Sequence, residues 1–339
     1  MADIVVCGDL EHKFQRSSEL ARLEAIGSVE IYDSIDPPRE QLNERLHQAR
    51  AILEIRGRTA LGRNVLTDLP DLQLVASTGP HRIDIQAATE LGIVVTTTPA
   101  VSTVGVADHV CGLILSLVRH IVTANNALRE RRWEPQTGFD LEGKTVGILG
   151  LGRIGSAVAR RLLGFGVNLI AWGPTLTPER AAASSAQFVS EETLFRSSDV
   201  LSVHLRYSPL SQDFVNASRL ALMKPTALLI DISRDGVVNR KALTAALKAG
   251  RLAGAAMDLC HPLPVDMNDP IFEAPRTLLT PHMAWQTAET FQRATRMSVD
   301  NILAYFSGQP VNVVNPDALK VSRRRPRPWL KPRFIPPVP

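Results

Sequence analysis

The sequence is poor in cysteine and in long apolar runs. Only three of its 339 residues are cysteine, namely Cys7, Cys111 and Cys260, and they follow no CxxC or metal-ligand spacing. We therefore expect buried free thiols and neither a metal site nor a disulfide framework. No apolar run reaches the roughly 20 residues that a membrane helix needs. The first residues also lack the basic segment and apolar core of a secretion signal. These absences predict a cytoplasmic protein without a membrane partner.

Acidic residues are missing from the last twenty positions, 320–339. This stretch holds seven of the 38 Lys and Arg residues and six of the 23 prolines. The rest of the chain contains 31 basic and 34 acidic residues. It is therefore mildly acidic, although the formal net charge of the whole chain is +4. The prolines prevent a regular helix or a central strand. We therefore expect residues 317–339 to form a disordered basic tail that has no nucleic-acid partner. The alternative is a tail that contacts nucleic acid or a membrane surface.

Strand-like runs alternate with helical patterns along most of the chain. The first hundred residues contain five such runs, Ile4–Cys7, Val29–Tyr32, Ala51–Ile55, Leu74–Ser77 and Ile93–Thr96. A second series begins at Lys144 and continues to Thr277–Leu279. This alternation predicts an α/β fold with parallel sheets and right-handed crossovers. A chain of this length exceeds one ordinary core, which predicts two domains.

One long helical pattern separates the two series. It runs from about Thr103 to Arg132, and its apolar stripe consists of Val106, Val110, Leu113, Ile114, Leu117 and Ile121. Apolar residues at this spacing predict a single helix with one buried face. A closing helix is predicted over Thr287–Phe306.

A glycine-rich segment in the second series is the most informative feature of the sequence. The apolar run Val146–Leu149 leads into Gly150, Gly152 and Gly155, which form a G-x-G-x-x-G and pass directly into a helical pattern. The first glycine of such a loop permits a tight turn, the second lets backbone amides approach a pyrophosphate, and the third lets helix and strand pack closely. Phosphates then lie at the positive end of the helix. With a further strand at Val167–Trp172, the segment predicts a dinucleotide site.

Four segments stand in an order and spacing that chance does not readily produce. They are Val146–Gly155, Ala221–Gly236, Gly250–Asp258 and Leu279–Trp285, the last containing Thr-Pro-His. Through them the chain resembles the D-isomer-specific 2-hydroxyacid dehydrogenase family, in particular its hydroxypyruvate and glyoxylate reductases. The resemblance covers residue 3 to about residue 316.

The resemblance implies two Rossmann-like or flavodoxin-like domains with parallel sheets. An NAD(P)-binding domain, residues 101–284, is then inserted into a substrate domain made of residues 1–100 and 285–316. The 103–132 region resembles the dimerisation segment of the family, so we expect a homodimer. The implied reaction is hydride transfer between NAD or NADP and a small 2-oxo acid or D-2-hydroxy acid.

Such a reaction needs one group that holds the substrate carboxylate and polarises the carbonyl, and another that delivers a proton to the oxygen. The resemblance assigns the first role to Arg234 and the second to His282. A guanidinium stays charged and matches a carboxylate bidentately, whereas an imidazole exchanges a proton near neutral pH. In isolation Arg234 would be a surface cation and His282 a turn histidine, but the matching segments favour catalytic roles.

The resemblance also implies the binding residues. The coenzyme would be bound by Thr103, Gly150, Gly152, Arg153, Ile154, Gly155, Thr175, His204, Arg206 and Asp258, the last facing the nicotinamide amide. The substrate would be bound by Arg56, Thr78 and Gly79, within a loop whose backbone amides hold its carboxylate. Three further residues, Arg58, His81 and Arg82, lie in the same segments. For them an exposed surface position is the alternative to a place in the substrate site.

One departure from the family pattern concerns the partner of the catalytic histidine. The family has a carboxylate 29 residues after the arginine, whereas position 263 is leucine in this chain. His282 therefore lacks the side chain that would favour its imidazolium form and fix its tautomer. His261 and Asp266 are the candidate substitutes.

A second departure concerns the nucleotide. The acid that would accept hydrogen bonds from the adenosine ribose is replaced by Gly173, so the charge that repels a 2′-phosphate is missing. Thr175, Thr177 and Arg180 follow closely and are able to receive a phosphate, but no Lys or Arg stands directly after Gly173. The sequence thus allows NADP as well as NAD.

Two other functions compete with this interpretation. Leu263 and the basic tail favour a nucleotide-sensing binding protein that keeps the fold without the catalysis. A dehydrogenase of another small anion, such as phosphite or formate, is the second alternative. Arg234 and His282 favour an enzyme, since a pure binding protein has little need of both.

Overall fold

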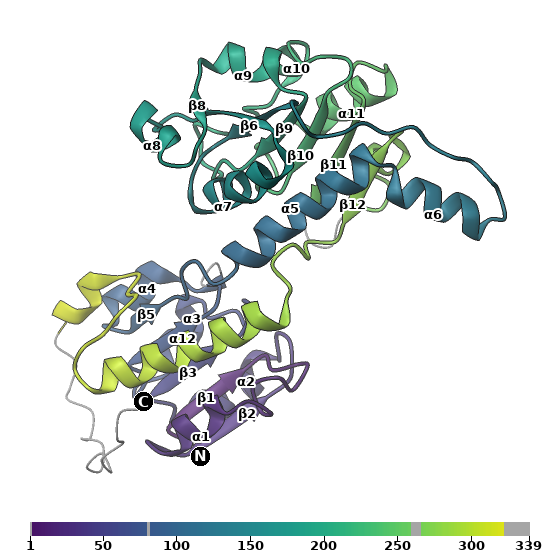
Figure 1. Cartoon of the computed structure of the whole chain (residues 1–339). Coiled ribbons are helices and arrows are strands. Elements are labelled where there is room, and N and C mark those ends of the chain that lie inside the picture. Colours follow the sequence, from purple (N-terminus) through teal and green to yellow (C-terminus); the bar gives the residue numbers. More distant parts are fainter. Residues whose placement is uncertain (1, 80–81, 259–265, 322–339) are drawn as a thin grey trace. The chain divides into compact units, whose positions relative to one another are not determined.

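The computed structural model describes residues 2–79, 82–258 and 266–321. The chain forms two compact units, one made of Met1–Val101 with Ala288–Pro339 and the other of Ser102–Thr287 (Figure 1). Each unit is built on one sheet, and every pair of neighbouring strands is parallel. The predicted α/β class with parallel sheets is therefore confirmed.

The first unit contains a five-stranded sheet in the order β2-β1-β3-β4-β5. Its strands are β1 (Ile4–Cys7), β2 (Val29–Tyr32), β3 (Ala51–Glu54), β4 (Leu74–Ser77) and β5 (Val94–Thr96). Its helices are α1 (Glu19–Glu24), α2 (Arg39–Leu46), α3 (Arg63–Thr67), α4 (Ile85–Glu90) and α12 (Ala288–Phe306), with a 3₁₀ turn at Pro316–Lys320. Successive side chains of each strand enter opposite cores, one under α2, α3 and α4 and the other under α1 and α12.

The second unit contains a seven-stranded sheet in the order β12-β11-β10-β9-β6-β7-β8. Its strands are β6 (Thr145–Leu149), β7 (Asn168–Trp172), β8 (Gln187–Phe188), β9 (Val200–Val203), β10 (Leu228–Asp231), β11 (Gly254–Asp258) and β12 (Thr277–Thr280). Its helices are α5 (Thr103–Val118), α6 (Ile121–Arg129), α7 (Arg153–Leu162), α8 (Pro178–Ala182), α9 (Glu191–Ser197), α10 (Ala217–Leu220) and α11 (Arg240–Lys248), with 3₁₀ turns at Leu163–Phe165 and Pro270–Glu273. The strand order reverses between β6 and β9, where dinucleotides bind in sheets of this kind.

The prediction of one helix from Thr103 to Arg132 is wrong. The pattern is split into α5 and α6, which meet at a 63° bend. His120 at the bend has a left-handed φ of 52°, and the Val118 carbonyl accepts a hydrogen bond from Phe139 N (3.1 Å) in the returning chain. A Cβ on Gly138 would lie 2.1 Å from that carbonyl oxygen, so the returning chain needs a glycine to cross the end of α5. Ile121, predicted on the buried stripe, is 52 % exposed as a result.

Cys7 is a buried free thiol, as predicted, whereas Cys111 is a free thiol that is only partly buried. Burial raises the pKa of Cys7 to about 12. Within the described ranges no cluster of three His, Cys, Asp or Glu side chains suits a metal ion. No single described helix is long and apolar enough to cross a bilayer, and only α5 and α6 taken together reach that length and composition. The predictions for Cys260, His261, Leu263 and His81, and for the tail beyond residue 321, concern positions outside the described residues. Residues 317–320, the start of the predicted disordered tail, lie in the 3₁₀ turn at Pro316–Lys320, where Ala318 is buried.

Candidate functional site

Most of the predicted site residues lie at one edge of the seven-stranded sheet. Each follows the carboxyl end of a strand: the glycine loop follows β6, Thr175 follows β7, His204 and Arg206 follow β9, Arg234 follows β10, Asp258 ends β11 and His282 follows β12. Because the strands are parallel, all these ends meet at the same edge, which is where open α/β sheets bind their ligands. Thr103, the remaining predicted coenzyme residue, begins α5.

The glycine loop has the geometry that its sequence predicts. Gly150 has a φ of +96°, and a Cβ there would lie 3.0 Å from backbone atoms of His204 and Leu205. A Cβ on Gly155 would lie 2.4 Å from the Gly150 carbonyl oxygen, so helix α7 packs directly on the loop. A Cβ on Gly152, by contrast, would meet no described atom within 4 Å. This open space at the start of α7, beside Arg153 and Ile154, fits a pyrophosphate.

The segment after β7 offers hydroxyl and guanidinium groups and no acid at position 173. Thr175 is exposed, and its carbonyl accepts a hydrogen bond from Arg180 Nη1 (2.8 Å). Thr177 Oγ1 accepts from Arg180 N (3.3 Å) and so caps α8. Gly173 is buried, but a Cβ there would have ordinary contacts of 3.5 Å or more. The glycine is therefore not required by packing.

His204 borders the same loop from the end of β9. Its Nε2 lies 2.8 Å from Ser202 Oγ, and its Nδ1 is buried without a hydrogen-bond partner among the described residues. Burial lowers the pKa of His204 to about 3, so the imidazole is neutral at physiological pH. Arg206, two residues further, is exposed.

Arg234 lies on the exposed turn after β10. Its Nη1 donates to the carbonyl of Ser233 (3.0 Å), and within the described part of the chain the guanidinium forms no ion pair. The turn is fixed by buried Asp231, whose carboxylate accepts hydrogen bonds from Ser233 N (2.9 Å) and Ser233 Oγ (2.6 Å). Arg234 and Asp258 line one small cleft between β10 and β11. A charged, planar donor group is thus available beside Asp258.

Asp258 is buried and anchors the turn that follows β12. Its Oδ1 accepts hydrogen bonds from Thr280 Oγ1 (2.6 Å) and Met283 N (2.9 Å), and its Oδ2 accepts one from Ala284 N (2.9 Å). Thr280 Oγ1 also lies 3.1 Å from Nε2 of His109 on α5. The Asp258 carboxylate, which the sequence predicts to face a nicotinamide amide, therefore forms hydrogen bonds within the protein.

His282 is half-buried and has a left-handed backbone, with a φ of 49°. For a residue with a Cβ this conformation costs on the order of 1–2 kcal/mol, and it persists only where neighbouring contacts enforce it. His282 N donates to the Thr280 carbonyl (3.1 Å), and its own carbonyl accepts from Gln286 Nε2 (3.1 Å). The imidazole meets the Trp285 ring edge-on, with centroids 6.5 Å apart.

In the first unit a buried acid shapes the loop that contains the predicted substrate residues. Glu54 ends β3, and its carboxylate accepts hydrogen bonds from Gly57 N (3.0 Å), Arg58 N (2.7 Å) and Ser77 Oγ (2.7 Å). Gly79 N in turn donates to Ser77 Oγ (3.0 Å). Glu54 thereby ties the carboxyl ends of β3 and β4 into one arrangement.

Arg56 lies in this loop with a left-handed φ of 68°. Its backbone N donates to Thr78 Oγ1 (2.7 Å), and its Nη1 pairs with Glu11 Oε1 (2.9 Å). Arg58, for which a surface position was the alternative, is mostly buried and pairs with the same carboxylate at 2.6 Å. Hydrogen bonds from Arg58 lower the pKa of Glu11 to about 2, so both ion pairs persist at neutral pH.

Three residues of these arrangements were missed by sequence reasoning. Glu54 is an acid at the end of an otherwise apolar strand, which was a visible signal. Thr280 belongs to the Thr-Pro-His segment, but nothing in the sequence indicates its hydroxyl contact. His109 lies within the helical pattern, and its partner is 171 residues away, so no local pattern reveals the pair.

Known proteins resemble this chain in both sequence and structure. Residues 111–284 match the family described as D-isomer specific 2-hydroxyacid dehydrogenase, NAD binding domain. The chain is 34 % identical over 313 residues to the glyoxylate reductase of Thermococcus litoralis, covering 88 % of this chain and 94 % of that protein. A putative D-3-phosphoglycerate dehydrogenase from Ralstonia solanacearum superimposes with a TM-score of 0.80 at 30 % identity, covering 94 % of this chain and 98 % of that one.

A D-lactate dehydrogenase of Aquifex aeolicus, solved with NAD and lactic acid, superimposes with a TM-score of 0.76 at 26 % identity. The superposition covers 92 % of this chain and 99 % of that one. The similarity thus extends over both units.

Proposed function

This chain belongs to the D-isomer-specific 2-hydroxyacid dehydrogenase family, and we propose that it reduces glyoxylate or a similarly small 2-oxo acid with NADH or NADPH. The observation that carries this proposal is the alignment of Arg234, Asp258 and His282 at the ends of three adjacent strands, β10, β11 and β12. A cation, an acid and an imidazole thus lie at the same edge of the sheet as the glycine loop, with only β9 between their three strands and β6.

Arg234 binds the substrate in this proposal. Its exposed guanidinium forms two parallel hydrogen bonds to a carboxylate and draws electron density from the adjacent carbonyl. The coenzyme supplies the hydride to the carbonyl carbon when bound. Positive charge close to the oxygen stabilises the negative charge that develops on it.

His282 is the proton donor for that oxygen. An imidazole is suited to this step because it gains and loses a proton near neutral pH. The fixed turn around His282 limits the positions that its ring can take. In the reverse direction the neutral ring takes the proton from the hydroxyl group.

The coenzyme lies along the glycine loop in this proposal. Gly150, Gly152, Arg153, Ile154 and Gly155 accommodate the pyrophosphate, Thr175 lies at the ribose, His204 and Arg206 lie at the adenine side, and Thr103 approaches the phosphates. The open space at Gly152 supports this placement, since no described side chain fills it. With glycine at position 173, both NADH and NADPH are accepted.

We further propose that three residues of the first unit, Arg56, Thr78 and Gly79, bind the substrate. The Thr78–Gly79 turn contacts the substrate in this proposal, and its two amides are bonded within the protein, Thr78 N to the Glu54 carbonyl (3.2 Å) and Gly79 N to Ser77 Oγ (3.0 Å). Glu54 keeps that turn in place through Ser77. Arg56 is already paired with Glu11, so its guanidinium contributes a partly neutralised charge.

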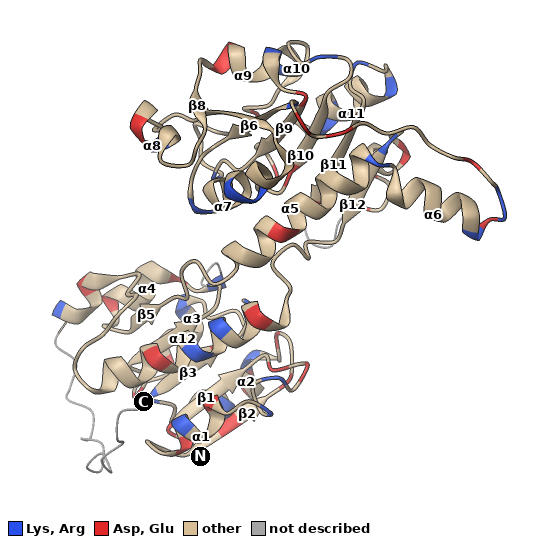
Figure 2. Ribbon diagram, viewed as in Figure 1, with Lys and Arg blue, Asp and Glu red and all other residues tan. Residues whose placement is uncertain are grey.

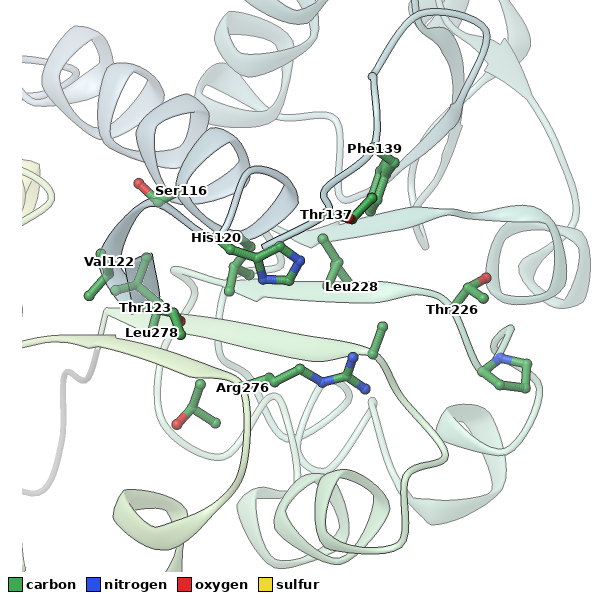
Figure 3. A pocket seen from close by; sticks show the side chains of 14 residues that line it. Ser116, His120, Val122, Thr123, Thr137, Phe139, Thr226, Leu228, Arg276 and Leu278 are labelled. Carbon is green, nitrogen blue, oxygen red and sulfur yellow. The ribbon is translucent and has the colours of Figure 1, made fainter. Parts of the chain in front are cut away.

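We also propose a homodimer, formed through α6 and the segment that follows it. This arm extends away from the sheet of the second unit (Figure 1) and carries no charged residue before Arg129 (Figure 2). Leu128 is 56 % exposed and Trp133 is 84 % exposed, and a second copy would cover these two apolar side chains. A cavity of about 360 Å³ at the foot of α6, lined by His120, Phe139 and Arg276 among others, adds concave surface to the same region (Figure 3).

A substrate panel tests the proposed activity. NADH or NADPH is supplied with each of the 2-oxo acids glyoxylate, hydroxypyruvate and pyruvate. NAD or NADP is supplied with formate or phosphite, and the absorbance of the nucleotide is followed in every case. We expect the highest kcat/KM for glyoxylate or hydroxypyruvate. Turnover of formate or phosphite alone would establish the other-anion alternative, and tight nucleotide binding without any turnover would establish a binding protein.

Light scattering after gel filtration tests the homodimer. Trp133→Ser should shift the protein toward the monomer mass, whereas Leu210→Ser, which removes another exposed apolar residue in the same unit, should not. A monomeric wild-type protein would refute this part of the proposal.

A further inference from the structure

The turn that carries His282 is held in place by the buried carboxylate of Asp258. Hydrogen bonds from Met283 N and Ala284 N, the two amides directly after His282, reach Oδ1 and Oδ2 of this carboxylate at 2.9 Å each. Both amides therefore face the same carboxylate, next to His282 with its left-handed φ of 49°. The position of the imidazole is therefore coupled to the position of Asp258.

The same carboxylate is connected to helix α5 through one hydroxyl group and one imidazole. Thr280 Oγ1 donates to Asp258 Oδ1 (2.6 Å), since an ionised carboxylate only accepts. The Thr280 hydroxyl proton is thus committed, so His109 Nε2, at 3.1 Å, donates to Thr280 Oγ1. The chain of hydrogen bonds runs in one direction, from His109 through Thr280 to Asp258. It requires the His109 tautomer with a proton on Nε2.

We propose that Asp258, Thr280 and His109 are positioning residues for His282, which act through the backbone of its turn. This inference rests on the proposed role of His282 as the proton donor. The backbone around the imidazole is fixed by the Asp258 carboxylate, which His109 and Thr280 hold in a defined place.

The chain connects three elements that are distant in sequence. His109 belongs to α5, Asp258 is the last residue of β11, and Thr280 is the last residue of β12. Thr280 is two residues before His282, and removal of its hydroxyl would leave both His109 Nε2 and Asp258 Oδ1 with one partner fewer. A small displacement of the carboxylate then moves the turn, and a shift of about 1 Å at a catalytic group lowers rates by up to about a hundredfold.

Substitution of Thr280 tests the chain with a matched set of variants. Thr280→Val removes the hydroxyl at nearly constant volume, and Thr280→Ser restores it. Thr277→Val makes the same change on the same strand, at a hydroxyl that contacts the Ala274 carbonyl instead. We expect kcat for glyoxylate reduction to fall at least tenfold in Thr280→Val, with KM and the Kd of the reduced nucleotide changed less than threefold. Thr280→Ser and Thr277→Val should retain kcat within about threefold.

Substitution of His109 provides a second test if Thr280→Val fails to fold. His109→Gln keeps an N–H donor near the position of Nε2, whereas His109→Leu removes it. We expect the glutamine variant to have several-fold higher kcat than the leucine variant, at equal nucleotide affinity. Equal kcat in the two variants, or equal losses in Thr280→Ser and Thr280→Val, would overturn the positioning proposal.

His282→Ala separates this inference from the proposed function. If His282→Ala retains wild-type kcat, His282 is not the proton donor and both proposals fail. If His282→Ala is inactive while Thr280→Val retains wild-type kcat, the proposed function stands and the positioning chain is refuted.

Discussion

Gly155 packs against Gly150 so closely that a Cβ on Gly155 would lie 2.4 Å from the Gly150 carbonyl oxygen. Helix α7 therefore begins directly on the loop at the end of β6, with Gly152 as its N-cap. The three glycines have different tasks in this arrangement. One permits the turn, one leaves room for a ligand and one permits the packing.

Alanine substitutions should distinguish the last two tasks. Gly155→Ala forces a backbone shift, because the obstructing atom is a carbonyl oxygen, and should destabilise the protein by about 1–3 kcal/mol. Gly152→Ala meets no described atom and should leave the melting temperature nearly unchanged, but its methyl group occupies the proposed pyrophosphate space. Calorimetric melting and nucleotide titration of both variants check this. A Gly152→Ala variant with wild-type nucleotide affinity would exclude the proposed coenzyme position.

Arg234→Lys should lower kcat/KM for the 2-oxo acid by roughly a hundredfold, or about 3 kcal/mol. The charge remains, but an ammonium cannot form the two parallel hydrogen bonds of a guanidinium. The side chain is exposed, so stability should not change. Steady-state kinetics with both nucleotides provide the measurement, and near-normal kinetics would remove Arg234 from the site.

Gly173→Asp should make the enzyme prefer NADH. The added Cβ has contacts no closer than 3.5 Å, so the backbone at this position accepts a side chain. A carboxylate there accepts hydrogen bonds from an unmodified ribose and repels a 2′-phosphate. We expect kcat/KM for NADPH to fall at least tenfold relative to NADH, whereas the wild type should discriminate by less than roughly a hundredfold. Strict preference for NADH in the wild type would show that another acid has this role.

Lowering the pH should destabilise the folded protein, in part because His204 is protonated more readily in the unfolded chain. Burial holds the pKa of this imidazole at about 3 in the folded state, against about 6.5 when it is unfolded. Between these values the unfolded chain binds a proton that the folded chain refuses, so stability falls as pH drops below about 6.5. The loss approaches 1.4 kcal/mol per pH unit at most.

His204→Gln removes this titration while keeping a polar group for Ser202. Chemical denaturation at pH 7 and pH 5 should show a smaller loss of stability in this variant than in the wild type. Equal losses would mean that His204 is protonated without penalty in the folded protein.

The parts of the fold that follow from local patterns could be predicted from the sequence. Strands β1, β2 and β4 have the predicted bounds because each is a short apolar run between turn residues. The break between α5 and α6 could not be predicted, because its cause is the contact of Phe139 with Val118, twenty-one residues earlier. The stripe from Val106 to Leu117 continued to Ile121 without a proline or glycine to mark the end.

The candidate site shows the same limit. The roles of Gly150, Gly152 and Gly155 could be predicted, because their spacing reflects a local geometry. The anchoring of the His282 turn was not, since Asp258, Thr280 and His109 come from three separate segments. Hydrogen bonds between distant segments leave no periodic signal in a single sequence.

The most direct test of the proposed function compares wild-type protein with His282→Ala in glyoxylate reduction, while nucleotide affinity is measured for both. We predict that the wild type oxidises NADH or NADPH only when glyoxylate or another small 2-oxo acid is present. His282→Ala should lose at least a hundredfold in kcat and bind the reduced nucleotide with unchanged affinity. Wild-type turnover in His282→Ala, or no turnover of any 2-oxo acid by a wild-type protein that binds the nucleotide, would contradict the account.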